Sequence, residues 1–128
     1  KRLLKVVAGD AVLRERLTHS VLRHEIAQRY IEAEVMYQFS MRISSMQNRG
    51  QLPNDEASMA KLFNSELSQR VAQTAMQVMG LRGQVTEDDG EASFGRHYLG
   101  MVPATIRGGT SEVQRNVIAT RGAGLPRG

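Results

Sequence analysis

The chain has 128 residues, of which 41% are hydrophobic and 23% are charged, and its formal net charge is +4. It contains no cysteine, which excludes disulfides and thiol chemistry. No segment has the roughly 18 consecutive apolar residues of a membrane-spanning helix, so we expect no membrane span and a cytoplasmic protein. The arginines are scattered singly among glutamates, which favours a solvated helical surface over a nucleic-acid-binding patch.

One long helix is predicted from Asp10 to Asn48, because this segment contains neither glycine nor proline. Asp10 is the expected N-cap, and Gly50 followed by Pro53 supplies the stop. Apolar residues recur at helical spacing in two rows: Leu22, Ile26, Tyr30 and Ala33, then Val35, Phe39, Ile43 and Met46.

A second helix is predicted from Asn54 to Gly80, with Asp55 and Glu56 in its first turn, where carboxylates favour the helix dipole. It carries two apolar stripes: Ala60, Phe63, Leu67, Val71, Ala75 and Val78 on one, and Leu62, Ala72, Met76 and Met79 on the other. Two stripes indicate a helix that is packed on two sides and is central in a bundle.

The segment after Gly80 reads as a loop with an acidic cluster, Glu87, Asp88 and Asp89. The spacing of these carboxylates does not match a calcium loop, so we interpret the cluster as solvated. Metal binding is poorly supported elsewhere, because His19 and His24 are five residues apart, off a common helical face, and His97 stands alone. No serine lies in a Gly-x-Ser-x-Gly turn, so no nucleophile of that kind is expected.

Two more helices complete the prediction. A short one is expected from Phe94 to Met101, before Pro103, and the last one begins near Thr110 or Ser111. Gly122 and Gly124 end that last helix. Since no segment shows the alternation of a strand, residues 1–128 are predicted to form an all-α, antiparallel up-down helical bundle.

The segment GGTSEVQRN places Gly108 and Gly109 directly before the last helix. Thr110 and Ser111 can each cap it, and Ser111 with Gln114 has the spacing of a capping box. Glycine permits close approach of a ligand, and free N–H groups at a helix start attract anions such as a pyrophosphate. The same residues also suit a well-capped helix without a ligand, and the local pattern leaves both interpretations open.

The C-terminal segment GGTSEVQRNVIATRGAGLPR resembles the C-terminal signature of acyl-CoA dehydrogenases, FAD-dependent enzymes that desaturate acyl-CoA thioesters. The segment NDEASMAKLFNSELSQRVAQTAMQVMG resembles the helix that precedes it in that family, and the order and separation of the two segments fit. The resemblance extends from about Asp10 to Arg127 and implies the C-terminal helical domain of a longer flavoprotein. A first residue, Lys1, that is not methionine agrees with that expectation.

The resemblance implies two groups of FAD contacts. Gln77, Val78, Met79, Gly80 and Leu81 match a segment that contacts the adenylate or diphosphate, commonly across a subunit interface. Family members usually have a second glycine where this chain has Leu81. The other cofactor contacts implied are Thr110, Ser111, Glu112 and Val113, and Gly109 matches a residue that lines the acyl-CoA pocket near the thioester.

Many family members have a glutamate at the position of Gly108, and that carboxylate removes the substrate α-proton. Glycine has no side chain and cannot act as a base, so no catalytic residue is implied in this chain. Two explanations stay open: the base comes from a helix upstream of Lys1, or a base-less subunit accompanies an active partner. A glutamate upstream would favour the enzyme, and its absence would favour a non-catalytic helical assembly subunit or a degenerate homologue.

The resemblance also implies partners. These are an acyl-CoA substrate, the remaining domains of the same protein, a homodimer, tetramer or heteromer, and electron-transfer flavoprotein as the electron acceptor. The 128-residue piece alone is expected to be inactive. A third alternative, a basic nucleic-acid-binding bundle, predicts duplex binding that weakens steeply with added salt.

Overall fold

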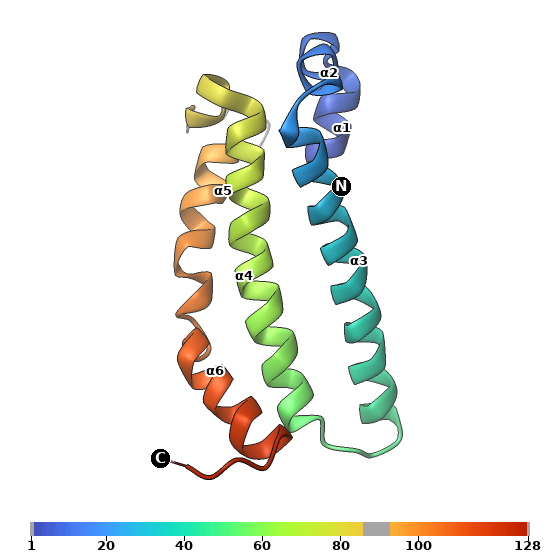
Figure 1. Cartoon of the computed structure of the whole chain (residues 1–128), viewed down its shortest axis with the longest axis vertical. Helices are drawn as coiled ribbons and strands as arrows, with labels where there is room; N and C mark the ends of the chain where they lie inside the picture. The colour runs from blue at the N-terminus through green and yellow to red at the C-terminus, as the bar shows by residue number, and fades with distance from the viewer. Residues whose placement is uncertain (1, 86–92, 128) are drawn as a thin grey trace.

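The protein is a bundle of helices in a computed structural model that describes residues 2–85 and 93–127 (Figure 1). No strand occurs within these two ranges. The elements are α1 (Arg2–Gly9), α2 (Ala11–Thr18), α3 (Val21–Asn48), α4 (Asn54–Met79), the 3₁₀ turn η1 (Gly80–Gln84), α5 (Phe94–Met101), the 3₁₀ turn η2 (Val102–Thr105), α6 (Ser111–Val117) and its π-helical continuation η3 (Ile118–Gly122). The predicted all-α class is confirmed. The acidic cluster Glu87, Asp88 and Asp89 lies outside the described residues.

The long helices alternate in direction. Helix α3 runs down the bundle, α4 returns beside it, and α5, η2 and α6 run back along the other side of α4 (Figure 1). The predicted turn between the first two is confirmed, because α3 ends at Asn48 and Gly50 has a left-handed φ of 72°. Helix α4 begins at Asn54 and stops at Met79, with Gly80 at its end, as the sequence predicts.

The prediction of one helix from Asp10 to Asn48 is wrong, because the chain breaks between α2 and α3. Asp10 does cap a helix, and its Oδ1 accepts hydrogen bonds from Val12 N at 3.0 Å and Leu13 N at 3.1 Å. That helix ends at Thr18, and Ser20 caps the next one by accepting from Leu22 N at 3.2 Å. The hydroxyl of Ser20 offers the backbone an alternative to the helical ladder. As a result α1 and α2 fold over one end of the bundle (Figure 1).

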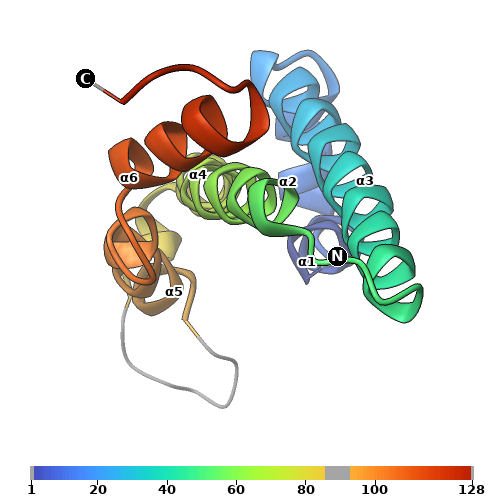
Figure 2. The same ribbon diagram turned by 90° about the horizontal axis from the view of Figure 1, so that it is seen from below.

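Helix α4 is the central element, as its two apolar stripes predict. It contacts α3 on one side and α5 and α6 on the other (Figure 2). Its buried residues are Ser58, Ser65, Leu67, Ala72, Thr74, Ala75, Val78 and Met79. Each large apolar side chain of this set contributes about 1.5–3 kcal/mol when fully buried. By contrast, none of the described residues of α3 is buried, and Tyr30 and Val35 from its apolar rows are more than half exposed.

A network of ion pairs links helices α3, α4 and α6. Glu32 on α3 pairs with Arg29 at 2.9 Å and with Arg70 of α4 at 3.5 Å. Arg70 also lies 4.0 Å from Glu66, which pairs with Arg115 of α6 at 2.6 Å. Because these side chains are partly exposed, each pair contributes little by itself, but the network links α3, α4 and α6 in one register.

Candidate functional site

The turn before α6 is held by side chains from two helices. The backbone φ is 68° at Gly108 and 95° at Gly109, both left-handed. The carbonyl oxygen of Gly109 accepts a short hydrogen bond from Nζ of Lys61 on α4. The carbonyl oxygen of Gly108 accepts one from Nε2 of Gln114 on α6, at 3.0 Å, and Gln114 is buried. The two peptide groups of the turn are therefore fixed from both sides.

The two glycines of this turn differ in how much room surrounds them. A Cβ atom on Gly109 would lie 2.6 Å from Nε2 of Gln114, closer than real contacts allow. A Cβ atom on Gly108 would have Lys61 Cε, at 4.0 Å, as its nearest described neighbour. Gly109 is therefore required by packing, whereas Gly108 is required only by its backbone conformation.

The start of α6 is satisfied by oxygen atoms of the chain itself. Thr110 is the N-cap, and its Oγ1 accepts from Val113 N at 3.3 Å. The capping box predicted for Ser111 and Gln114 is wrong, because Ser111 is already inside the helix and Gln114 reaches back to Gly108 instead. The Glu112 carboxylate accepts from its own backbone N–H and from the Thr110 hydroxyl, and both hydrogen bonds lower the pKa of Glu112. The ionised carboxylate of Glu112 therefore lies at the start of α6, where the sequence pattern allowed an external anion to bind.

The second group of predicted contacts lies at the C-terminal end of α4. Val78 is 1% exposed and Met79 is 9% exposed, so their side chains belong to the core. Gln77 and Leu81 are exposed on either side of them. Gly80 turns the chain with a φ of 59°. Of the five predicted residues, only Gln77, Gly80 and Leu81 therefore present a surface that a ligand can reach.

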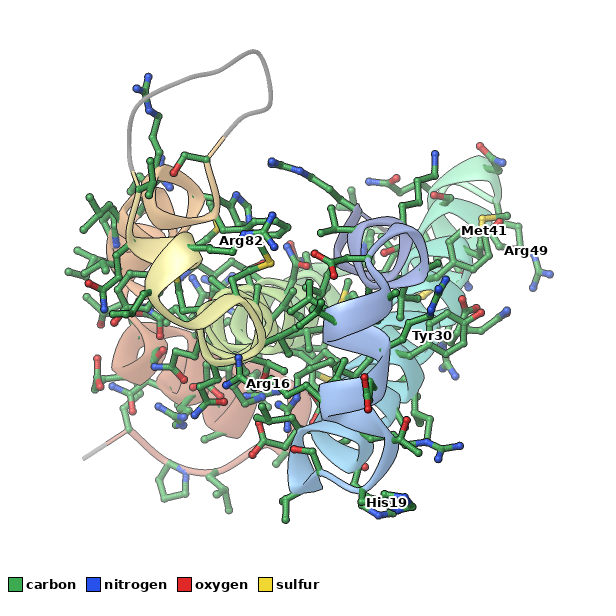
Figure 3. The ribbon with its side chains drawn as sticks, turned by 90° about the horizontal axis from the view of Figure 1, so that it is seen from above. Arg16, His19, Tyr30, Met41, Arg49 and Arg82 are labelled. Atoms are coloured by element: carbon green, nitrogen blue, oxygen red, sulfur yellow. The ribbon has the colours of Figure 1, made fainter. Side chains whose placement is uncertain are left out.

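Two arginines lie next to the Gly80 corner, the turn at which α4 meets η1. Nη1 of Arg16, from α2, donates to the carbonyl oxygen of Val78 at 3.3 Å. A Cβ atom on Gly80 would lie 3.4 Å from that same nitrogen. Arg82, from η1, is labelled with Arg16 in Figure 3. It pairs with Asp10 at 2.8 Å. The hydrogen bond from Arg82, followed by those from the backbone N–H groups of Leu13 and Val12, lowers the pKa of Asp10.

The structure does not bring the two predicted groups together. Lys61, which holds the Gly109 turn, and Gln77, which begins the Gly80 corner, both lie on α4. At 1.5 Å per residue they are about 24 Å apart along the helix axis. Figure 1 accordingly shows α6 and η1 at opposite ends of α4. Within one copy of the chain the predicted cofactor residues form two separate sites.

Other predicted features form no site among the described residues. His19 follows α2 and His24 lies on α3, so the two are not on one helix as the sequence suggested. In residues 2–85 and 93–127, no group of three His, Cys, Asp or Glu side chains is placed to hold a metal ion. Over the same residues, no helix combines the length and apolarity needed to cross a membrane.

Sequence reasoning missed one apolar cavity of about 310 Å³. It lies between α3, α4 and η3, and its lining consists of Val35, Met36, Phe39, Met59, Leu62, Phe63, Glu66 and Ile118. Most of these residues belong to the helical apolar pattern, which predicts burial but does not distinguish a filled core from a hollow one. The packing between α3 and α4 is therefore incomplete at the end of the bundle nearer α6.

The described residues form an all-helical domain with a left-handed glycine turn before α6. Residues 6–123 match the family "Acyl-CoA dehydrogenase, C-terminal domain", and the chain belongs to that family. Acyl-CoA dehydrogenase IpdE1 of Mycolicibacterium smegmatis is 30% identical over 120 residues, which cover 94% of this chain and 27% of that protein. Human mitochondrial short-chain specific acyl-CoA dehydrogenase is 45% identical over 64 residues, which cover 50% of this chain and 15% of that protein.

Solved structures agree on the fold. The Tcur3481-Tcur3483 steroid ACAD superposes with a TM-score of 0.85 at 21% identity, covering 99% of this chain and 33% of that one. The ChsE4-ChsE5 complex from Mycobacterium tuberculosis gives a TM-score of 0.74 at 31% identity, covering 88% of this chain and 30% of that one. The chain thus spans between a quarter and a third of the length of IpdE1 and of these structures.

Proposed function

We propose that the chain is the C-terminal helical domain of an FAD-dependent acyl-CoA dehydrogenase. The reaction is α,β-dehydrogenation of an acyl-CoA thioester, in which the bound FAD supplies the hydride acceptor. The observation that carries the proposal is the Gly108–Gly109 turn, held by Lys61 and Gln114 in a chain of this family. Such a fixed, left-handed turn presents backbone rather than side chains, which suits a wall against which a bulky thioester lies.

The Gly80 corner fits one end of a dinucleotide. Gly80 has no side chain to keep a ligand away, Gln77 offers a carboxamide and Leu81, 83% exposed, offers an apolar surface. Val78 and Met79 contribute only through their backbone. At the opposite end of α4, Thr110, Glu112 and Val113 present the accessible part of the second FAD contact, and Ser111 supports it from the core.

Two separated contacts are consistent with FAD bound between subunits. Since the two groups lie about 24 Å apart along α4, they touch different parts of one extended cofactor or two cofactors in an oligomer. The names of the relatives Tcur3481-Tcur3483 and ChsE4-ChsE5 describe assemblies of two different chains. These names favour an assembly of several subunits, and we propose a dimer, tetramer or heteromer. We also propose that the protein lies in the cytoplasm and that electron-transfer flavoprotein is its electron acceptor.

The proton acceptor of the reaction lies outside this chain. Gly108 has no proton-accepting group, and its closest described neighbour is the side chain of Lys61, whose Nζ already donates to Gly109. Glu112 is engaged with its own helix, where Thr110 and the backbone N–H hold it ionised. A carboxylate from a helix upstream of Lys1, or from an active partner subunit, would remove the α-proton.

The second candidate function is a non-catalytic assembly subunit, and Gly108 is the observation that favours it. A visible absorption spectrum of the purified protein tests whether the FAD site is assembled. An oxidised flavin band supports the dehydrogenase, and turnover of acyl-CoA then identifies the active form. A colourless protein that takes up no added FAD would contradict the first proposal and leave the assembly subunit.

A further inference from the structure

Lys61 is a half-buried cation beside the Gly108–Gly109 turn. Its side chain comes from α4, and its Nζ donates a hydrogen bond to the carbonyl oxygen of Gly109. An ammonium group has three N–H donors, so donors remain for other groups. Among residues 2–85 and 93–127, no carboxylate lies within ion-pair distance of Lys61. The fold therefore places a positive charge without an ion-pair partner at the turn.

The charged groups around Lys61 come from α6 and from the segment before the turn. Hydrogen bonds from its own N–H and from Thr110 lower the pKa of Glu112 most, and the charges of Arg115 and Lys61 lower it further. Arg107 is exposed, and its guanidinium donates to a carbonyl oxygen of α5 at 3.2 Å. The charge of Lys61 thus reaches the exposed start of α6, where Glu112 is held by its own helix.

Gly108 leaves Lys61 open to a group from another element. Gly108 is exposed, and a Cβ atom built on it has Cε of Lys61, at 4.0 Å, as its nearest described neighbour. By contrast, a Cβ atom on Gly109 meets Gln114 at 2.6 Å. The space of a Gly108 side chain is therefore empty of described atoms and adjoins the lysine, whereas the space at Gly109 is filled.

The chemistry of the proposed reaction indicates which group enters this space. A proton acceptor must come within hydrogen-bond reach of the α-proton, and the proposed function places the thioester against Gly109. An acceptor from outside this chain therefore approaches the turn on which Lys61 acts. An ammonium group favours an ionised carboxylate, with which it forms a charge-assisted hydrogen bond, and disfavours a base that becomes a cation.

We propose that Lys61 is a positioning residue, whose ammonium group holds the proton-accepting carboxylate over Gly108. This inference rests on the proposed function. In the reaction the Cα–H bond breaks and an O–H bond forms on the carboxylate. The electron pair of the broken bond forms the Cα=Cβ double bond as hydride leaves the β-carbon for the FAD. Lys61 keeps its proton throughout and acts only through the carboxylate that it orients.

The first test is cross-linking in the whole flavin-loaded protein that contains this chain. A water-soluble carbodiimide converts an ion pair between a carboxylate and an ammonium group into an amide, and mass spectrometry of the peptides identifies the carboxylate joined to Lys61. We expect an aspartate or glutamate from outside residues 1–128. Its peptide shows whether the base belongs to the same polypeptide or to a partner subunit. A cross-link to Glu112 alone, or no cross-link, overturns the proposal.

The second test measures proton removal apart from hydride transfer. The probe is a 3-thia-acyl-CoA, whose β-position is a sulfur without a hydrogen, and the readout is exchange of its α-protons with deuterium from solvent. Lys61→Met and Gln114→Met each remove one side-chain donor to the turn, but only the first removes a charge. The acid limb of the pH profile should move up by about one unit in Lys61→Met and stay in place in Gln114→Met. Lys61→Arg keeps the charge and should keep the wild-type limb.

Two outcomes of the exchange measurement overturn the proposal while leaving the proposed function intact. They are an unshifted acid limb in Lys61→Met and equal shifts in Lys61→Met and Gln114→Met. Either would mean that Lys61 supports only the backbone of the turn. The cross-link decides the question if Lys61→Met does not fold. A wild-type protein that binds no FAD and exchanges no α-proton defeats the proposed function and this inference together.

Discussion

The two ends of α4 hold their glycine corners by different physical means. At the α6 end, the Gly109 turn is fixed by Lys61 and Gln114, and a Cβ atom on Gly109 has no space. At the other end, Gly80 is bordered by Arg16 and by the exposed pair of Arg82 with Asp10. The turn at Gly109 is therefore determined by shape and partly buried hydrogen bonds, and the corner at Gly80 by charges that are accessible to water and salt. We expect substitutions to affect protein stability at the first corner and ligand binding or pH dependence at the second.

The largest effect is expected from Gly109→Ala. The substitution places Cβ 2.6 Å from Nε2 of Gln114 and forces a side chain onto a φ of 95°. Gln114 is buried and can move only by giving up its bond to Gly108 O. Together the strain and the clash cost about 3 kcal/mol of unfolding free energy, measured by urea denaturation.

Gly108→Ala is the matched control for that substitution. Its φ is also left-handed, but the nearest described atom is 4.0 Å from the added Cβ. The expected loss is about 1 kcal/mol, from backbone strain alone. Equal losses in the two variants would show that the contact with Gln114 does not shape the turn.

Lys61→Met is expected to have the next largest effect. It removes the donor to Gly109 O and keeps most of the aliphatic side chain, so a half-buried carbonyl loses its partner. The expected cost is about 2 kcal/mol in the same urea measurement. Lys5→Met, on the exposed face of α1, should leave stability unchanged within about 0.5 kcal/mol. A neutral result at Lys61 would place the support of the turn on Gln114 alone.

The contrast between the ends also explains what the sequence could predict. Two apolar stripes and a terminal glycine were enough to predict α4 and its central position. Burial on two faces and a left-handed residue at the helix end both leave local patterns in the sequence. The break before α3 was missed, because one serine hydroxyl inside a glycine-free segment determines it. The partners of the two corners were also missed, since Lys61 is 48 residues from Gly109 and Arg16 is 62 residues from Val78. Such pairings depend on how the helices return beside one another.

Thr110→Asp sharpens the comparison by adding charge to the corner that is otherwise determined by shape. Aspartate caps a helix as well as threonine does, so the unfolding free energy should change by less than about 0.5 kcal/mol. The new carboxylate lies beside ionised Glu112, and FAD retention should weaken about two- to fivefold. Thr110→Asn provides a neutral cap of the same shape. If flavin content is the same in all three proteins, Thr110 does not contact the cofactor.

The smallest effect concerns the pair of Asp10 with Arg82. The pKa of Asp10 in the folded protein lies below its ordinary value of 3.8, so the pair stabilises the fold above that value and the contribution is lost as the pH falls through the lowered pKa. Asp10→Asn keeps a side-chain oxygen for the cap of α2 but removes the charge. Its melting temperature should therefore be slightly lower than wild type near pH 7 and should converge with wild type once the pH falls below the lowered pKa of Asp10. Added salt should reduce the difference at neutral pH, because Arg82 is exposed and Asp10 is partly exposed. A difference that persists at low pH would mean that Asp10 acts through the cap of α2 rather than through Arg82, and the Gly80 corner would then resemble the Gly109 turn in depending on local shape.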